Sequence, residues 1–227
     1  MSNQSIQNVL VIGLGKLGLT WALVLASKGF KVFGVDVNAK AINDLNNGIL
    51  TISEPGCQEL YDKYRNNIHF STDVSGIDSH IDCSFVVVPT PSLGDDRFDS
   101  SYVQKALLNA DKFWCSQAMY SNVVITSTVM PGESNRLLSL MSENFTKKVA
   151  NNTIGFCYNP EFIALGSVVK DMLNPDFILI GSNSLEASSR LANIYKIVNG
   201  EDVEIKSMSL ESCLLYTSPS PRDATLS

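Results

Sequence analysis

The chain has 227 residues, of which 44% are hydrophobic and 18% are charged, and its formal net charge is -6 at pH 7. This composition supports a folded protein with a sizeable core. The acidic balance, with no basic run longer than the pair Lys147 and Lys148, argues against a protein that binds nucleic acid.

Apolar, β-branched runs alternate with segments of helical spacing along most of the chain. The runs predict strands over residues 9–13, 31–36, 83–89, 122–128, 153–158 and 176–181. The segments between them predict helices over residues 16–28, 39–46, 100–118, 133–145 and 185–199. Strands that alternate with helices form a mostly parallel sheet that is covered on both faces. We therefore expect a single doubly wound α/β domain of the Rossmann type over residues 1–206.

The first apolar stretch, residues 9–27, also has the length of a membrane anchor. Lys16 lies at its centre, where a charge costs about 2.5 to 3.5 kcal/mol on insertion scales, and the residues before it include no basic side chain. We therefore predict a strand, a turn and a helix here, and no membrane partner.

Five cysteines and two histidines are the candidate metal ligands and reactive thiols. The cysteines stand at positions 57, 83, 115, 157 and 213 without a C-x-x-C pair, so we predict no metal site. Their wide spacing, with no signal peptide at the start of the chain, favours reduced thiols in a cytoplasmic protein over a disulfide framework.

A glycine-rich turn joins the first predicted strand to the first predicted helix. Its residues are Gly13, Leu14, Gly15, Lys16, Leu17 and Gly18. The glycines of such a turn allow a tight bend, close approach of a pyrophosphate and close packing of helix on strand, and the phosphate lies at the helix N-terminus. A turn of this kind is weak evidence by itself, because glycine also serves ordinary connections between strand and helix.

Asp36 ends the next predicted strand and strengthens the interpretation of the glycine turn. A carboxylate in this place accepts a hydrogen bond from the ribose 2′-hydroxyl of NAD and repels the 2′-phosphate of NADP. Lys40 either weakens this preference slightly or is a solvated charge on the following helix. The order of strand, turn, helix, strand and acid predicts NAD as the cofactor, with Asp36 and Lys40 among the residues near it.

Three later loops follow predicted strands, at the edge where open α/β sheets bind ligands. Thr90 and Pro91 follow the strand over 83–89, and Thr128 ends the strand over 122–128. Glu161 follows the strand over 153–158 as a single carboxylate. Spacing alone leaves Glu161 open between a catalytic acid and a solvated acid at a helix start.

These loops belong to a series of blocks that resembles the N-terminal NAD-binding domain of the UDP-glucose/GDP-mannose dehydrogenases, the nucleotide-sugar 6-dehydrogenases. The blocks are GLGKLGL, VDVNAKAINDLNNG, ISEPGCQEL, VPTPSLGDDRFDSSYV, STVMPGES and YNPEFIALGSVVKDMLNPDFILIG. The similarity covers about residues 7–206. Blocks in this order are far more specific than the glycine turn alone.

The resemblance implies an NAD-dependent oxidation of the C6 alcohol of a nucleotide sugar, with a UDP-sugar favoured, to a uronic acid. In that family the reaction passes through aldehyde and thioester stages on a cysteine of a later domain. The resemblance also implies catalytic roles for Thr128 and Glu161, contacts from Thr90, Pro91 and Thr128 to the cofactor, and contacts from Glu161, Phe162 and Leu165 to the substrate. It further implies a homo-oligomeric full-length parent, assembled through a central domain outside this chain.

Several positions depart from the family pattern. Leu165 stands where many members that oxidise UDP-glucose have a second glutamate, and a leucine cannot relay a proton. Phe162 stands where members acting on N-acetylhexosamine nucleotides usually have arginine, so the sugar stays open. Lys16 replaces a common aromatic residue, and Phe177 replaces a common arginine. Neither of these two changes removes a backbone feature that NAD requires.

The family pattern stops near the end of the chain. Residues 207–212 resemble the start of the linker to the family's central helix, whereas residues 213–227 are rich in Ser and Pro and aperiodic. We predict that residues 213–227 are a non-native tail, because CLLYTSPSPRD matches a translation of a transposon-end adapter used in sequencing libraries. A natural disordered tail is the alternative.

Two cysteines of this chain, Cys213 and Cys157, are poor candidates for the missing nucleophile. Cys213 has no neighbouring cation in sequence to lower its pKa, and Cys157 lies inside an apolar strand. We therefore expect a fragment that binds NAD weakly and does not turn over, since the family's nucleophile, lysine and asparagine lie outside it.

Two further functions stay open at this point. A hydroxyacid dehydrogenase could share the cofactor turn, but it needs a catalytic Lys or His, and neither His69 nor His80 has a suitable setting. A non-catalytic NAD-binding module that ends at Ser227 is the other alternative.

Overall fold

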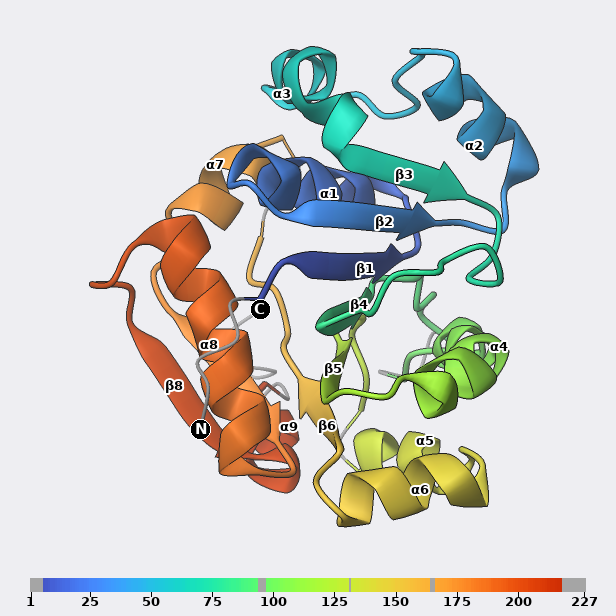
Figure 1. Ribbon diagram of the computed structural model, residues 1–227. Helices are drawn as coiled ribbons and strands as arrows, with labels where there is room; N and C mark the ends of the chain where they lie inside the picture. The colour runs from blue at the N-terminus through green and yellow to red at the C-terminus, as the bar shows by residue number, and fades with distance from the viewer. Residues whose placement is uncertain (1–5, 94–96, 131, 164–165, 218–227) are drawn as a thin grey trace.

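Each strand predicted from an apolar run is present, and two further strands complete the sheet. The computed structural model describes residues 6–93, 97–130, 132–163 and 166–217, whose strands form one eight-stranded sheet (Figure 1). The strands are β1 (Asn8–Ile12), β2 (Lys31–Val35), β3 (Ile68–Ser71), β4 (Cys83–Val86), β5 (Ser121–Ile125), β6 (Ile154–Tyr158), β7 (Ile178–Ser182) and β8 (Ile205–Ser209).

The order of strands in the sheet is β3-β2-β1-β4-β5-β6-β7-β8. The chain therefore proceeds from β1 towards one edge and from β4 towards the other, which makes the boundary between β1 and β4 the switch point of the sheet. All neighbouring strands run parallel except β6 and β7, which are antiparallel. The predicted doubly wound, mostly parallel sheet is confirmed.

Four of the five predicted helices are present, the fifth is divided in two, and the structure adds elements that the sequence pattern did not indicate. They are α1 (Lys16–Ser27), α2 (Ala39–Asn46), α3 (Cys57–Tyr64), α4 (Ser101–Ser116), α5 (Glu133–Ser139), α6 (Glu143–Ala150), α7 (Val168–Leu173), α8 (Leu185–Asn199) and α9 (Leu210–Thr217), with a short 3-10 turn, η1 (Arg65–Asn67). The single helix expected over 133–145 is divided into α5 and α6. Ser142 caps α6, and the buried Asp111 of α4 accepts from both the Ser142 N–H and its hydroxyl, each at 2.7 Å.

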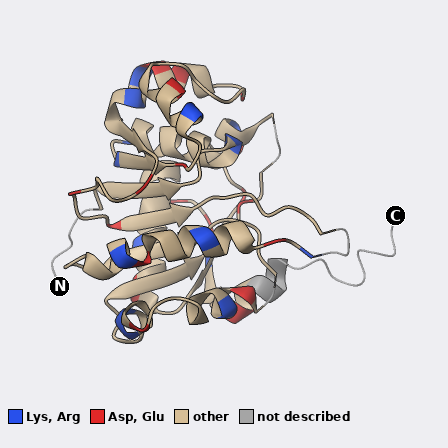
Figure 2. Ribbon diagram, turned by 90° about the vertical axis from the view of Figure 1, so that its right-hand side faces the viewer, with Lys and Arg blue, Asp and Glu red and all other residues tan. Residues whose placement is uncertain are grey.

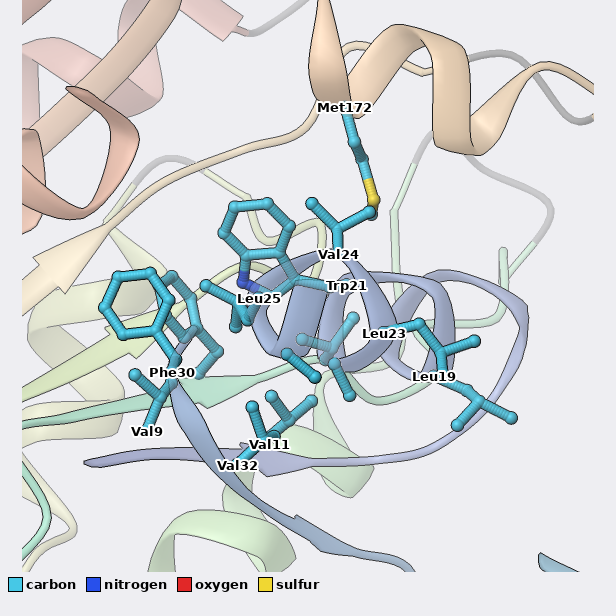
Figure 3. Packing of buried hydrophobic residues seen from close by; sticks show 14 of the residues in the cluster. Val9, Val11, Leu19, Trp21, Leu23, Val24, Leu25, Phe30, Val32 and Met172 are labelled. Atoms are coloured by element: carbon cyan, nitrogen blue, oxygen red, sulfur yellow. The ribbon is translucent and has the colours of Figure 1, made fainter. Parts of the chain in front are cut away.

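Side chains of each strand alternate between two cores, one on each face of the sheet. On one face Val9 and Val11 of β1 pack with α1, α3, α7 and α8, and on the other face Leu10 and Ile12 pack with α4, α5, α6 and α9. Figure 3 shows the first core around α1, where Met172 of α7 lies beside Val24. Strands buried on both faces explain the nearly continuous apolar runs in the sequence.

The sheet continues beyond residue 206, where the sequence predicted the end of the domain. Strand β8 pairs in parallel with β7, and Leu210 and Cys213 of α9 are buried. A side chain on Gly181 of β7 would come within 2.6 Å of the Cys213 Cβ, so α9 lies directly on the strand. Residues 207–213 are therefore packed on the sheet, while the expected non-native origin of residues 213–227 stays a prediction.

The surface carries charges of both signs. In the view of Figure 2, Lys and Arg residues are distributed over several separate helices, close to Asp and Glu residues. Within the described ranges no helix is both long and apolar enough to cross a membrane, and no group of His, Cys, Asp and Glu could hold a metal ion.

Candidate active site

The glycine turn after β1 is shaped by close backbone contacts. Gly13 has φ +95°, and a Cβ on it would lie 2.2 Å from the Val87 carbonyl oxygen, so the turn requires glycine there. A Cβ on Gly18 would lie 1.9 Å from the Gly13 carbonyl oxygen, which presses α1 against the turn. At Gly15, by contrast, no atom lies within 4 Å of the position of a Cβ. The turn is thus packed tightly against the protein at Gly13 and Gly18, whereas the space beside Gly15 contains no protein atoms.

The open side of the turn exposes the N-terminus of α1. Gly15 is the N-cap residue, no side chain caps the helix, and its first turn contains no acidic residue. The free N–H groups and the helix dipole there favour an anion. Leu17 is half-buried, and its side chain packs against the core beneath α1. This geometry fits a pyrophosphate at Gly15.

Asp36 lies beside the turn and is held by two backbone groups. Its carboxylate accepts from the Leu14 N–H at 2.7 Å and from the Asn38 N–H at 2.9 Å. Asp36, Leu14 and Lys16 line a cavity of about 500 Å³ that also reaches Lys40 and residues 49–52. Lys40 is exposed and pairs with Asp44 at 2.5 Å in an i, i+4 ion pair. The cavity is therefore placed for a ribose and its base, next to the pyrophosphate space.

The loops after β4 and β5 lie beside the glycine turn and are tied together by one hydroxyl. Ser127 Oγ accepts from the Val88 N–H at 2.9 Å and lies 2.8 Å from the Val88 carbonyl oxygen. This link fixes the backbone just before the predicted residues Thr90 and Pro91 in one loop and Thr128 in the other. Pro91 and Thr128 are exposed and Thr90 is half-buried, so all three are accessible at this edge.

Glu161 follows β6 and is hydrogen-bonded to a residue of the core. The Tyr195 hydroxyl of α8 lies 2.8 Å from Glu161 Oε1 and also hydrogen-bonds Asn159 Oδ1. Asn159 Nδ2 in turn donates to the Leu179 carbonyl oxygen of β7 at 2.9 Å. Burial raises the pKa of Glu161 to about 7. Glu161 is therefore not a fully solvated acid at a helix start, and its proton is exchangeable near neutral pH.

Two aromatic rings lie next to Glu161 because β7 runs antiparallel to β6. Tyr158 at the end of β6 pairs with Gly181 near the end of β7, so the segment after β6 runs towards the start of β7. Phe177 there lies with its ring centroid 5.1 Å from that of Phe162. Glu161, Phe162 and Phe177 line a cavity of about 310 Å³. Phe162 is 54% exposed, as a residue that contacts a ligand can be. Leu165, which was predicted to contact the substrate, lies outside the described residues.

Glu54 connects the cofactor turn with the segment that follows Glu161. Its side chain is 2% exposed, and Oε1 lies 3.7 Å from the Lys16 ammonium. Oε2 accepts from the Gly166 N–H at 3.0 Å. The block ISEPGCQEL was noticed in the sequence, but this connection depends on residues far apart in the chain.

Sequence reasoning missed Asn159, Tyr195 and Ser127 as parts of the site. Tyr195 lies at a core position of an amphipathic helix, and such a position usually indicates packing alone. Asn159 stands in the quoted block YNPEF, but a local pattern does not show that its amide points to a neighbouring strand.

Comparison with known proteins assigns this arrangement to one family. The model of the UDP-glucose/GDP-mannose dehydrogenase family, NAD binding domain, matches residues 7–199. The chain is 31% identical over 186 residues to the UDP-glucose 6-dehydrogenase AglM of Haloferax volcanii, with 82% of this chain and 43% of that protein covered. It is 32% identical over 200 residues to a UDP-N-acetyl-D-mannosamine dehydrogenase of Methanococcus maripaludis, with 86% and 43% covered.

A solved structure agrees with the sequence comparisons. The crystal structure of a ternary complex of GDP-mannose dehydrogenase from Pseudomonas aeruginosa superposes with a TM-score of 0.82 at 29% identity, with 92% of this chain and 48% of that chain covered. The chain thus spans about half the length of the relatives that it matches. It belongs to the UDP-glucose/GDP-mannose dehydrogenase family, and its fold is the NAD-binding domain of that family.

Proposed function

We propose that the chain is the cofactor-binding part of a nucleotide-sugar 6-dehydrogenase, which oxidises the C6 alcohol of the sugar to a carboxylate. One observation carries this proposal. At a single edge of the sheet, an open glycine turn after β1 lies in the same row of loops as an exposed hydroxyl after β5 and a half-buried carboxyl with a raised pKa after β6. Such a row supplies a place for a dinucleotide and groups for proton transfer.

The residues of the turn have complementary roles in this proposal. The N-terminus of α1 binds the pyrophosphate above Gly15, and Asp36 accepts from the adenosine ribose while the Leu14 N–H keeps its carboxylate in place. Lys16 and Lys40 line the cavity that Asp36 lines, and Thr90 and Pro91 contact the cofactor from the loop after β4 in this proposal. Bound NAD supplies the hydride acceptor for the oxidation.

Thr128 and Glu161 carry the proton chemistry in the proposal. The exposed Thr128 hydroxyl can hold a water molecule or the sugar hydroxyl at the end of β5. Glu161, with a pKa of about 7, can take a proton from a bound hydroxyl or return it at physiological pH. A carboxyl with an ordinary pKa would be a much weaker base.

The substrate in this proposal is a UDP-sugar. Two of the similar proteins are, by name, dehydrogenases of UDP-glucose and of UDP-N-acetyl-D-mannosamine. A GDP-mannose 6-dehydrogenase is also similar, so the nucleotide has to be tested directly. Phe162 and Phe177 offer apolar faces for the sugar or for its substituents.

The chain by itself is proposed to bind NAD without turnover. The thioester chemistry requires a thiolate, and burial raises the pKa of each of the five cysteines. For Cys213 the pKa is raised to about 12. We further propose that the parent protein is a cytoplasmic homo-oligomer, in keeping with free thiols, which persist in reducing compartments.

Calorimetric titration of the purified chain with NAD and with NADP tests the cofactor proposal. We expect saturable binding of NAD and weaker binding of NADP. Incubation with NAD and UDP-glucose, UDP-N-acetylmannosamine or GDP-mannose should give no NADH. Steady NADH formation from any of these sugars would contradict the proposal that the nucleophile lies outside this chain.

A further inference from the structure

The hydroxyl of Tyr195 lies between two groups that could both accept its proton. Asn159 Oδ1 and Glu161 Oε1 both hydrogen-bond to it. A tyrosine hydroxyl has a single proton to donate, and it accepts through its oxygen. In one of the two hydrogen bonds the tyrosine oxygen must therefore accept. The donor in that hydrogen bond is either Asn159 or Glu161.

The orientation of Asn159 decides the direction of the first contact. Its amide atom nearest β7 faces the Leu179 carbonyl oxygen at 2.9 Å, and a carbonyl oxygen cannot donate. That atom must be Nδ2, so Oδ1 faces Tyr195 and can accept but not donate. The Asn159 N–H donates to the Ile125 carbonyl oxygen at 2.9 Å, which fixes the backbone as well. Tyr195 consequently donates to Asn159.

Tyr195 itself is held in place by its ring. The ring stacks on Trp21 of α1 with a centroid distance of 5.5 Å and an interplanar angle of 24°. The hydroxyl is fully enclosed with the rest of the side chain, which is 1% exposed. Buried donors and acceptors are almost always paired in folded proteins. In the hydrogen bond between Tyr195 and Glu161, the proton therefore has to come from Glu161.

We propose that Asn159 and Tyr195 are positioning residues that hold Glu161 as a neutral carboxylic acid which donates to the Tyr195 oxygen. Oε2 of the acid is left to accept from a hydroxyl in the neighbouring cavity. Ionisation releases the proton to water, turns the Tyr195 O–H towards the new carboxylate and leaves Asn159 Oδ1 without its donor. The loss of that hydrogen bond opposes ionisation.

The charges around Glu161 are consistent with a neutral acid. Tyr195 approaches it from α8, and Lys170, Asp171 and Asp176 line the same cavity. No Lys or Arg among the described residues lies within 4 Å of its carboxylate oxygens in an ion pair. Burial is the main cause of the raised pKa of Glu161, whereas a hydrogen bond donated by Tyr195 to the carboxylate lowers that pKa. With the Tyr195 proton directed to Asn159 Oδ1, this opposing effect is removed.

The use of this acid in sugar oxidation rests on the function proposed above, whereas its protonation does not. Infrared difference spectra between the wild-type chain and Glu161→Gln, recorded without cofactor or sugar, therefore test the inference alone. At about pH 6 we expect the C=O band of a protonated carboxyl, and we expect carboxylate bands to replace it with a midpoint near pH 7. Carboxylate bands already present at about pH 6 would overturn the proposal.

A second variant tests the role of Asn159. Asn159→Ala removes the acceptor and frees the Tyr195 proton for the carboxylate, so the midpoint should fall by about one to two pH units. Asn122→Ala is the matched control, because Asn122 is also buried and donates to a backbone carbonyl, that of Ala187, at 2.9 Å. An unchanged midpoint in folded Asn159→Ala, or an equal fall in Asn122→Ala, would overturn the proposal.

Discussion

The loops after β1 and after β6 lie at the same edge of the sheet, but they build their chemistry from different sources. After β1 the backbone of residues 13–18 forms the site, packed against the Val87 carbonyl. After β6 a single side chain, Glu161, is tuned by Asn159 and by Tyr195, which is remote in sequence. A site made of backbone groups can be formed by residues that are close in sequence. A carboxyl with a shifted pKa requires neighbours that only the folded structure brings together.

The largest effect should come from the backbone site. Gly13→Ala places a Cβ against the Val87 carbonyl at a left-handed φ, and we expect a loss of more than about 3 kcal/mol in the free energy of unfolding. Gly15→Ala meets open space and should cost less than about 1 kcal/mol. Urea denaturation measures both. Similar losses in the two variants would show that the turn is not closed at Gly13.

The carboxyl site should reveal itself through the pH dependence of stability. A carboxyl whose pKa is raised by folding binds its proton more tightly in the folded state, so its contribution to stability is full below its ordinary pKa, about 4.3, and is lost as pH rises through about 7. The loss should reach roughly 3 kcal/mol in the wild type.

Glu161→Gln should remove this dependence, since glutamine does not titrate. Urea denaturation at a series of pH values gives the comparison, and Glu143→Gln, which changes an exposed acid, is the control. If the free energy of unfolding falls between about pH 4 and pH 7 by the same amount in Glu161→Gln as in the wild type, Glu161 is not the acid with the raised pKa.

The cofactor preference should depend on Asp36. Asp36→Asn removes a charged acceptor, so affinity for NAD should fall about 10- to 100-fold, while affinity for NADP should fall less or rise. Calorimetric titration measures both ligands. Asp44→Asn is the matched control, because Asp44 lines the same cavity and pairs with Lys40 instead. An equal loss in the two variants would point to the charge of the cavity and not to a ribose contact.

The smallest effect is expected for Lys40. Its ion pair with Asp44 is exposed, and such pairs on helices contribute about 0.3 to 0.5 kcal/mol. Lys40→Ala should therefore lower the free energy of unfolding by no more than this and leave NAD binding within about twofold. A tenfold loss of NAD affinity would instead place Lys40 in contact with the cofactor.

Sequence patterns were sufficient where the signal is a run of apolar residues or a local turn. The buried strands β1, β2 and β4–β7 are of this kind, as is the glycine turn. Strands β3 and β8 were missed because exposed or half-buried positions interrupt their burial pattern. The break between α5 and α6 depends on Asp111, whose role at Ser142 no local pattern predicts.

The direction of β7 limited the prediction of the site. Its apolar run indicates a strand but not whether the strand is parallel, and the antiparallel pairing with β6 is what brings Phe177 to Phe162. The same packing brings Leu179 to Asn159 and α8 over Glu161. The residues that tune Glu161 thus follow from tertiary structure and not from spacing.

A crystal structure of the chain in complex with NAD would show directly whether cofactor and acid share one edge of the sheet. We expect the pyrophosphate at Gly15 on the N-terminus of α1, the adenosine ribose on Asp36, and the nicotinamide towards the loops that carry Thr128 and Glu161. A dinucleotide bound elsewhere, or bound with its nicotinamide directed away from Glu161, would contradict the proposal that one edge of the sheet unites cofactor and acid.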